Sequence, residues 1–298
     1  TLSSSSAASD VYKRQVLVDV NDGAAKGKAL DLFQSSPVEY FDSKITGTAD
    51  YKDTAGSDVV IITAGIPRKP GMSRDDLVST NAKIMETCAK SAIEYSPNAF
   101  FIIVANPLDA MCYVAQKVTN LPRERIVGMA GVLDTARYKG FIAEAANVSV
   151  EDISAIVLGG HGDTMVPFPR FTSVGGIPLD KFLPKETIDS IVTRTRNGGA
   201  EIVGLLKTGS AYYAPAASAV AMAESVLKDK KRILPCACLL NGEYGVKGFF
   251  VGVPCKLGGK GMEAVVELDL NSEEKKMLDH SVNAVKELVA STQKIMGW

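Results

Sequence analysis

The chain contains only two histidines, His161 and His280, so a reaction that needs an imidazole has two candidates. His161 stands in the segment GGHGD, directly after an apolar run, and its flanking glycines allow a ligand or a neighbouring backbone to approach closely. A neutral imidazole near pH 7 can give and take protons when a carboxylate orients it. We therefore interpret His161 as a candidate proton donor and acceptor, with a structural histidine as the alternative. His280 falls within a helical pattern and receives no role.

Asp134 and Arg137 lie three residues apart in LDTAR and therefore on one face of a predicted helix near 134–146. The carboxylate could hold an imidazole, while the guanidinium could bind a substrate carboxylate through two parallel hydrogen bonds. An ion pair within the helix would explain the same spacing.

Polar residues also follow three predicted strands, where open parallel sheets bind ligands. Asp19 closes VLVDV and could accept hydrogen bonds from both ribose hydroxyls of an adenine dinucleotide, which favours NAD over NADP; a solvated or capping aspartate is the alternative. Residues 65–77 contain two Gly, two Pro and three cations, as in a mobile lid or a solvated basic loop. Asn106 precedes Pro107, and its amide could bind a ligand or begin a turn.

The elements that must position these residues follow from hydropathy. Residues 58–65 and 100–107 are continuous apolar runs that end in Gly or Pro, typical of strands buried on both faces of a parallel sheet. A short strand at 16–20 precedes them. The predicted helices between the strands are 26–36, 76–95 and 108–119. This alternation predicts an α/β fold with a doubly wound parallel sheet of the Rossmann type.

After about residue 132 the pattern changes to α+β. The helix near 134–146 is followed by a strand at 154–159, a Gly/Pro-rich stretch at 249–261 and an alternating segment at 264–270. A closing helix begins after Asn271, with Glu274 three residues on. Its predicted apolar stripe is Leu278, Val282, Val285 and Val289.

Composition excludes several classes of protein. The 33 Lys and Arg against 34 Asp and Glu give a net charge of -1, which argues against nucleic acid or an anionic membrane as a partner. The strongly apolar runs are far shorter than the roughly 20 residues that span a bilayer. Five scattered cysteines do not form a zinc site, so we expect no metal and reduced thiols in a soluble cytoplasmic protein.

Six motifs together resemble one family. They are VLVDV, ITAGIPRKPGMSRDDL, ANPLD, GVLDTAR, GGHGDTMVP and TGSAYYAPAAS. Their order and approximate spacing, over about residues 16 to 298, resemble the malate/lactate dehydrogenase family, and within it the malate dehydrogenases of the lactate-dehydrogenase-like type. The resemblance implies NAD as cofactor, a small dicarboxylate substrate and a homo-oligomer.

The resemblance also implies roles in the reaction. His161 matches the proton donor and acceptor, Asp134 the carboxylate that orients it, and Arg137 the clamp on the C1 carboxylate of a 2-oxo acid. Arg74 matches the arginine that polarises the reacting carbonyl. Arg68 matches the position that reads the far end of the substrate, where a permanent charge suits the second carboxylate of oxaloacetate. The sequence therefore favours malate over lactate, and lactate dehydrogenase is the alternative.

Three further residues match cofactor positions in the family. Asn106 matches a contact to substrate and nicotinamide, Asn81 a further cofactor contact, and Val104 a backbone contact beside the nicotinamide. With Asp19 they form the predicted cofactor site.

The sequence departs from the family before Asp19. A dinucleotide fold needs a strand, a Gly-x-Gly-x-x-Gly turn and a helix, with the acidic residue ~20 residues after the glycines. Only 18 residues precede Asp19, and none is glycine. We expect the sheet to lack its first strand and this chain to bind NAD poorly, so a catalytically impaired fragment is a further alternative. The expected division is 1–15 as an unrelated or disordered segment, 16–132 as a truncated NAD-binding domain, and 133–298 as the catalytic domain.

Overall fold

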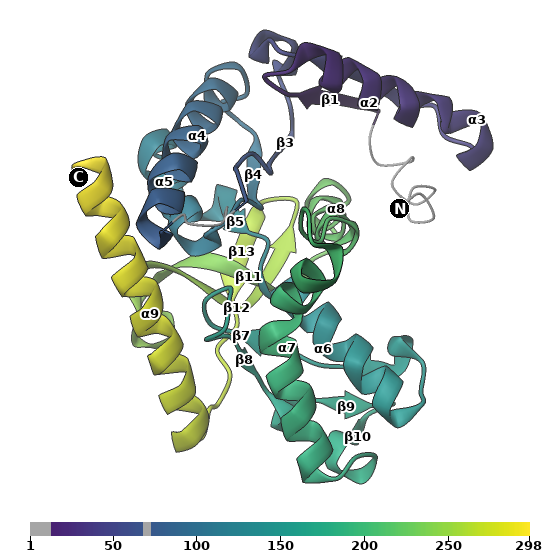
Figure 1. Ribbon diagram of the computed structural model, residues 1–298, viewed down its shortest axis with the longest axis vertical. Helices are drawn as coiled ribbons and strands as arrows, with labels where there is room; N and C mark the ends of the chain where they lie inside the picture. The colour runs from purple at the N-terminus through teal and green to yellow at the C-terminus, as the bar shows by residue number, and fades with distance from the viewer. Residues whose placement is uncertain (1–12, 68–72) are drawn as a thin grey trace.

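The computed structural model describes residues 13–67 and 73–298, and a mixed sheet flanked by helices lies at its centre (Figure 1). Six strands of these residues form the sheet, in the order β13-β12-β11-β5-β4-β3. In chain order they are β3 (Val59–Ile62), β4 (Phe100–Ile103), β5 (Ile126–Gly128), β11 (Arg232–Asn241), β12 (Lys247–Gly258) and β13 (Gly261–Val265).

The parallel half of the sheet consists of β3, β4 and β5. Val59 pairs with Phe100 and Phe101 pairs with Ile126, so the three strands run in one direction. Helices α4 (Arg74–Tyr95) and α5 (Leu108–Thr119) follow β3 and β4, close to the ranges that the sequence predicts. The carboxyl ends of these strands therefore meet at one edge, as a doubly wound fold requires.

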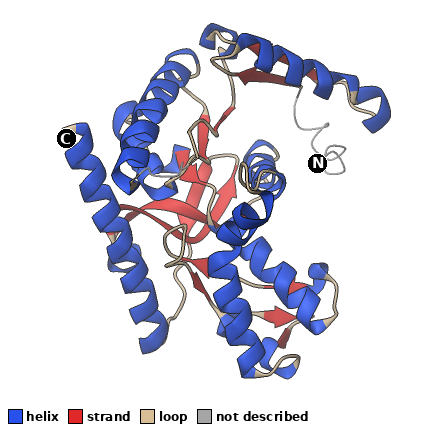
Figure 2. Cartoon of the chain, in the orientation of Figure 1, coloured by secondary structure: helices blue, strands red, loops and turns tan. Residues whose placement is uncertain are grey.

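The four residues of β4 divide the hydrophobic core. Phe100 and Ile102 belong to a cluster that includes residues of α8 (Tyr213–Leu227), whereas Phe101 and Ile103 pack with α4 and α5. Successive side chains of a strand point to opposite faces, and every side chain of β4 is buried. The continuous apolar run is thus explained by helices on both faces of the sheet (Figure 2).

The N-terminal strands form a separate sheet. Strand β1 (Arg14–Val18) pairs in parallel with β2 (Lys44–Thr48), and α2 (Asp22–Gln34) and α3 (Ser36–Glu39) connect them. Within the described ranges no strand pairs with the outer edge of β3, which agrees with a Rossmann-type sheet that lacks its first strand.

The predicted bounds of the first strand were wrong. Strand β1 begins at Arg14, inside the segment that we expected to be unrelated or disordered, because its ladder with β2 continues to the pair of Arg14 and Lys44. It ends at Val18 rather than Val20, since Val20 is fully exposed in the turn that enters α2. Residues 1–12 lie outside the described residues.

The other half of the sheet is antiparallel. Strand β11 joins β5 through the pair of Ala237 and Gly128, and β12 and β13 follow in a meander. Most of the Gly/Pro-rich stretch 249–261 thus lies in strands; Pro254 pairs with Pro235, so two residues without an N–H face each other. The alternating segment 264–270 leaves the sheet after Val265, earlier than predicted.

The remaining elements lie mostly below the sheet in Figure 1, with α9 along its left side next to α5. They are the helices α6 (Gly131–Ala146), α7 (Lys185–Leu206) and α9 (Ser272–Met296) and the two-residue strands β6 (Ile153–Ser154), β7 (Val157–Leu158), β8 (Val166–Pro167), β9 (Ser173–Val174) and β10 (Ile177–Pro178). The predicted strand 154–159 is therefore split between β6 and β7.

Helix α9 begins as the sequence predicts. The side chain of Asn271 accepts hydrogen bonds from the backbone of Glu273 and Glu274, and the Glu274 side chain accepts from the Asn271 backbone. The predicted stripe of four apolar residues is buried.

No helix in residues 13–67 and 73–298 is both long and apolar enough for a bilayer crossing. Over the same ranges, no cluster of His, Cys, Asp and Glu side chains could hold a metal ion.

Candidate active site

One buried carboxylate joins the two basic groups that the sequence singles out. His161 lies in the loop between β7 and β8, and its Nδ1 is 2.9 Å from Oδ2 of Asp134 on α6. One turn further along α6, Arg137 donates from a guanidinium nitrogen to Asp134 Oδ1 at 3.2 Å. The Asp134 side chain is only 2% exposed. Because Nδ1 faces the carboxylate, Nε2 is the ring nitrogen that can exchange a proton with a ligand.

The environment of His161 favours its charged form. Burial alone would lower the pKa of the imidazole, but the charge and hydrogen bond of Asp134 act in the opposite direction. The charge of Asp109 adds to this effect, and that of Arg137 reduces it. The net result is a pKa raised above the ordinary histidine value, which suits a group that delivers a proton near neutral pH.

Two buried side chains hold the GGHGD loop by its backbone. The backbone N–H of Gly160 donates to Oγ of Ser281 on α9 at 2.9 Å. The backbone N–H of His161 donates to Oδ2 of Asp109 on α5 at 3.0 Å. The loop leaves no room for side chains here, since a Cβ on Gly159 would lie 2.5 Å from Ser281 Oγ. The glycines therefore let two helices fix the position of the imidazole.

Asp109 was not predicted as a site residue. It is 3% exposed, and its Oδ1 is buried without a hydrogen-bond partner. Burial raises the pKa of Asp109 to about 6, against the opposing effect of His161. In the sequence it is the one charged residue among the apolar residues 108–115, and this is the signal that could have indicated it.

The predicted cofactor residues lie at the carboxyl ends of the parallel strands. Asn81, 1% exposed on α4, accepts from the Ile66 backbone and donates to the backbone oxygens of Ile66 and Asn106. It thereby ties the loop after β3 to the loop after β4. Val104 donates its backbone N–H to Ile62, and Asn106 is exposed. Their roles as cofactor contacts stay predictions.

Asp19 stands at the carboxyl end of β1. Its Oδ1 accepts the N–H of Asn21 at 2.9 Å in a local turn, while Asn21 itself caps α2; the bond therefore leaves Oδ2 of Asp19 for another partner. Beyond the carboxyl end of β2 lies an open hollow of about 550 Å³. Its lining includes Asp22, Thr48 and Asp50, which the sequence had not indicated, and it does not include Asp19.

The side chains of the two arginines in segment 65–77 lie outside the described part of the structure. Arg74 is the first residue of α4, directly after the capping residue Ser73. Arg68 lies outside the described residues. The predicted substrate contacts of both stay predictions. His280, which received no role, is exposed on α9.

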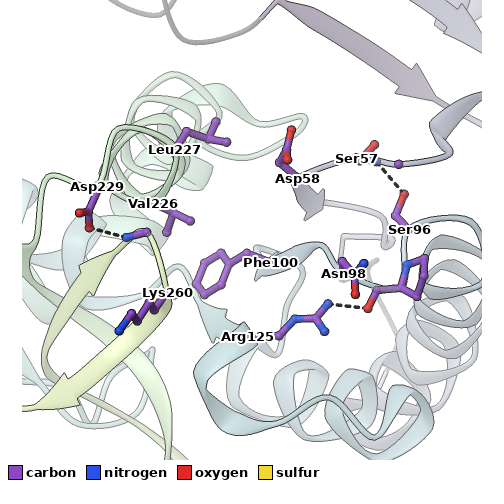
Figure 3. Close-up of a pocket in the computed structure, with 14 residues that line it drawn as sticks. Ser57, Asp58, Ser96, Asn98, Phe100, Arg125, Val226, Leu227, Asp229 and Lys260 are labelled. Carbon is purple, nitrogen blue, oxygen red and sulfur yellow. Dashed lines mark hydrogen bonds between the residues drawn. The ribbon is translucent and has the colours of Figure 1, made fainter.

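A second hollow lies at the amino ends of β3 and β4, the edge of the six-stranded sheet opposite to Val104 and Asn106 (Figure 3). It has a volume of about 700 Å³, and its lining includes Asp58, Phe100, Arg125, Val226 and Lys260. These residues gather at the amino ends of β3 and β4, whereas ligands of parallel sheets bind at the carboxyl ends. The imidazole, its carboxylate and the adjacent guanidinium therefore mark the better candidate for chemistry, namely reversible proton transfer to an anionic ligand.

Two family models match the chain in succession. Residues 1–128 match the lactate/malate dehydrogenase NAD-binding domain, and residues 131–295 match the lactate/malate dehydrogenase alpha/beta C-terminal domain. The chain belongs to the lactate/malate dehydrogenase family.

Relatives in this family are similar over most of the chain. A malate dehydrogenase of Roseiflexus sp. (strain RS-1) is 58% identical over 276 residues, which cover 93% of this chain and 89% of the relative. The solved malate dehydrogenase from Salinibacter ruber is 48% identical with a TM-score of 0.94, covering 99% of this chain and 94% of that one. A lactate dehydrogenase from Eimeria maxima, solved with NADH and oxamate, is 44% identical with a TM-score of 0.91, covering 95% and 87%.

Proposed function

We propose that this chain is an NAD-dependent oxidoreductase that interconverts (S)-malate and oxaloacetate. The observation that carries the proposal is the buried carboxylate of Asp134, which binds the imidazole of His161 through one oxygen and the guanidinium of Arg137 through the other. A proton donor and an anion-binding group are thereby held side by side, as reduction of a 2-oxo acid requires.

Each side chain has a distinct part in oxaloacetate reduction. Arg137 binds the C1 carboxylate, and protonated His161 gives its Nε2 proton to the carbonyl oxygen. Asp134 stabilises the imidazolium before transfer and keeps the ring oriented afterwards. Arg74 stabilises negative charge that develops on the same oxygen. When bound, the nicotinamide supplies a hydride for the carbonyl carbon.

The residues present fit the two ends of NAD better than its middle. The free oxygen of Asp19 suits a ribose hydroxyl of the adenosine end. Asn106 and Val104 are assigned to the nicotinamide end. For the pyrophosphate, no residue between 13 and Asp19 is glycine, so the described residues before Asp19 offer no glycine-rich turn.

The choice of malate over lactate rests on Arg68. Oxaloacetate has a second carboxylate that a closed lid would bury. Burying this charge without a counter-ion would cost roughly several kcal/mol of binding free energy. Pyruvate carries only a methyl group at this point. The fold does not decide between the two, since the structures from Salinibacter ruber and Eimeria maxima resemble the chain about equally. The name of the relative from Roseiflexus supports malate.

The test is a steady-state assay of NADH oxidation with oxaloacetate and with pyruvate. We expect oxaloacetate to be preferred, and Arg68→Gln to shift the preference towards pyruvate by about tenfold or more, because one charge-assisted hydrogen-bond pair is lost. Lys69→Gln removes a neighbouring cation and serves as the control, with an unchanged preference. Equal losses on both substrates in Arg68→Gln would contradict the assignment.

We extend the proposal to organisation and setting. Residues 16–132 hold the coenzyme, residues 133–298 supply the catalytic groups, and the protein is a homo-oligomer of the cytoplasm. All five cysteines are free thiols, which supports a reducing compartment. Exposed apolar side chains such as Phe33, Leu205 and Tyr213 support an interface between copies. Analytical ultracentrifugation tests the oligomer, and a monomer at micromolar concentration would contradict it.

A further inference from the structure

Two adjacent glycines stand in the interior of α7, the helix that packs beside α6. Gly198 is buried and Gly199 is half-buried, and both have helical backbone. Glycine inside a helix is less stable than alanine because it has more conformational freedom to lose on folding. The pair therefore calls for a reason in the packing of this helix.

The space that these glycines leave is filled by the side chain of Arg137. A Cβ on Gly198 would lie 3.2 Å from Arg137 Cδ and 3.7 Å from its Nε. A Cβ on Gly199 would lie 3.9 Å from Nη2 of the same guanidinium. The Arg137 side chain thus runs along the backbone of α7, and its Nε is buried there without a hydrogen-bond partner.

Helix α7 is fixed where it passes Arg137. The guanidinium of Arg194 bonds Glu144 at 3.1 Å and lies 4.1 Å from the ring centre of Phe141, both on α6. Arg196 donates from Nε to the backbone oxygen of Met165, just after the GGHGD loop, at 3.0 Å. A methyl group added at Gly198 would therefore displace the arginine more readily than the helix.

We propose that Gly198 and Gly199 are positioning residues that set the direction of the Arg137 guanidinium, and so the affinity for the substrate's C1 carboxylate. The inference rests on the proposed function, in which Arg137 binds that carboxylate. Asp134 on α6 holds one nitrogen of the guanidinium by a hydrogen bond, and the backbone of α7 at the two glycines restricts where the remaining atoms of the Arg137 side chain can lie. Two parallel hydrogen bonds to a carboxylate need a fixed plane, which this packing supplies.

Gly198→Ala tests the proposal, with Gly204→Ala as a matched control on the same helix. Gly204 is exposed, and a Cβ there would meet nothing within 4 Å. Both variants gain helix propensity, so the proposal expects both to fold. Gly198→Ala should raise KM for oxaloacetate by about three- to tenfold, with a smaller effect on kcat and none on KM for NADH, because a misplaced clamp weakens substrate positioning. Gly204→Ala should leave all three constants unchanged.

Crystal structures of the parent and both variants separate this inference from the proposed function. The expected result is a guanidinium that moves away from α7 in Gly198→Ala and stays in place in Gly204→Ala. An unmoved guanidinium, or an unchanged KM for oxaloacetate in Gly198→Ala, would overturn the inference. If the parent reduces no oxaloacetate but the guanidinium moves as expected, the proposed function fails while the positioning role stands.

Discussion

Asp134 is buried with two basic partners, and this sets how the candidate site responds to substitution. A buried charge is tolerated because both of its oxygens are bonded, to His161 and to Arg137. Removing either partner leaves an uncompensated charge beside the reacting atoms. The three side chains therefore act as a unit, and their separate effects on activity will not add.

Asp109 supports the same unit from beneath the loop. Asp109→Ala leaves the buried N–H of His161 without an acceptor, and we expect the free energy of unfolding at pH 7 to fall by about 1–3 kcal/mol. We also expect lower kcat, because the imidazole is then less well held. Urea unfolding monitored by circular dichroism measures the first effect. Asp163→Ala, an exposed acid in the same loop, is the control; an unchanged midpoint for Asp109→Ala would argue against this role.

At the scale of elements, helices with strong local signals could be predicted from the sequence. The bounds of α5 and the start of α9 follow from periodicity and capping residues. Strand β11 was missed although residues 233–240 form a continuous apolar run like those of β3 and β4, because the run contains Pro235 and β11 is nevertheless an inner strand between β5 and β12. Its residues do not alternate between apolar and polar, and proline is usually excluded from inner strands, so both local rules argued against a strand here.

The candidate site could be predicted in part for the same reason. Asp134 and Arg137 share a helix, so their proximity follows from spacing alone. The contacts of the His161 loop with Asp109 and Ser281 bridge more than 50 and 120 residues, respectively, and depend on how α5 and α9 pack. No local pattern encodes such contacts, and the same holds for the glycines of α7.

The start of α9 offers a test at this scale. Asn271 accepts two backbone N–H groups that would otherwise lack partners at the helix end. Asn271→Ala should therefore lower the free energy of unfolding by about 1 kcal/mol. Thermal unfolding measures the loss, and Asn271→Ser, which keeps a capping oxygen, should restore most of it. Equal losses in both variants would show that the cap contributes nothing.

At the scale of the whole molecule, the sheet separates two ends with different chemistry. Asp19 follows the carboxyl end of β1, and Val104 and Asn106 follow that of β4, while Asn81 on α4 bonds the loop after β3. The GGHGD loop lies against strand β12 through Gly159 and Gly252. The amino ends carry the hollow of Figure 3, with no imidazole in its lining. Within the described ranges, β1 and β3 have one unpaired edge each.

The sequence before Asp19 leads to a prediction for coenzyme binding. A protein made of residues 1–298 alone should bind NADH weakly, because its sequence before Asp19 contains no glycine-rich turn for the pyrophosphate. We expect at least tenfold tighter binding, about 1.4 kcal/mol, when a strand, a glycine-rich turn and a helix are joined before β1. Titration of NADH fluorescence measures both proteins. Equal, tight binding would contradict the expectation.

The most direct measurement of the account is an NMR pH titration of the two imidazoles in the parent and in Asp134→Asn. His161 and the exposed His280 are the only histidines, so a His280→Gln variant, which has one imidazole signal left, assigns the two signals independently of Asp134. In the parent, the pKa of His161 is raised because Asp134 outweighs burial, so the ring keeps its proton to higher pH. Without that charge, burial dominates, and the pKa of His161 should fall. A His161 pKa that stays the same or rises in Asp134→Asn would contradict the central claim that this carboxylate prepares the imidazole to donate a proton.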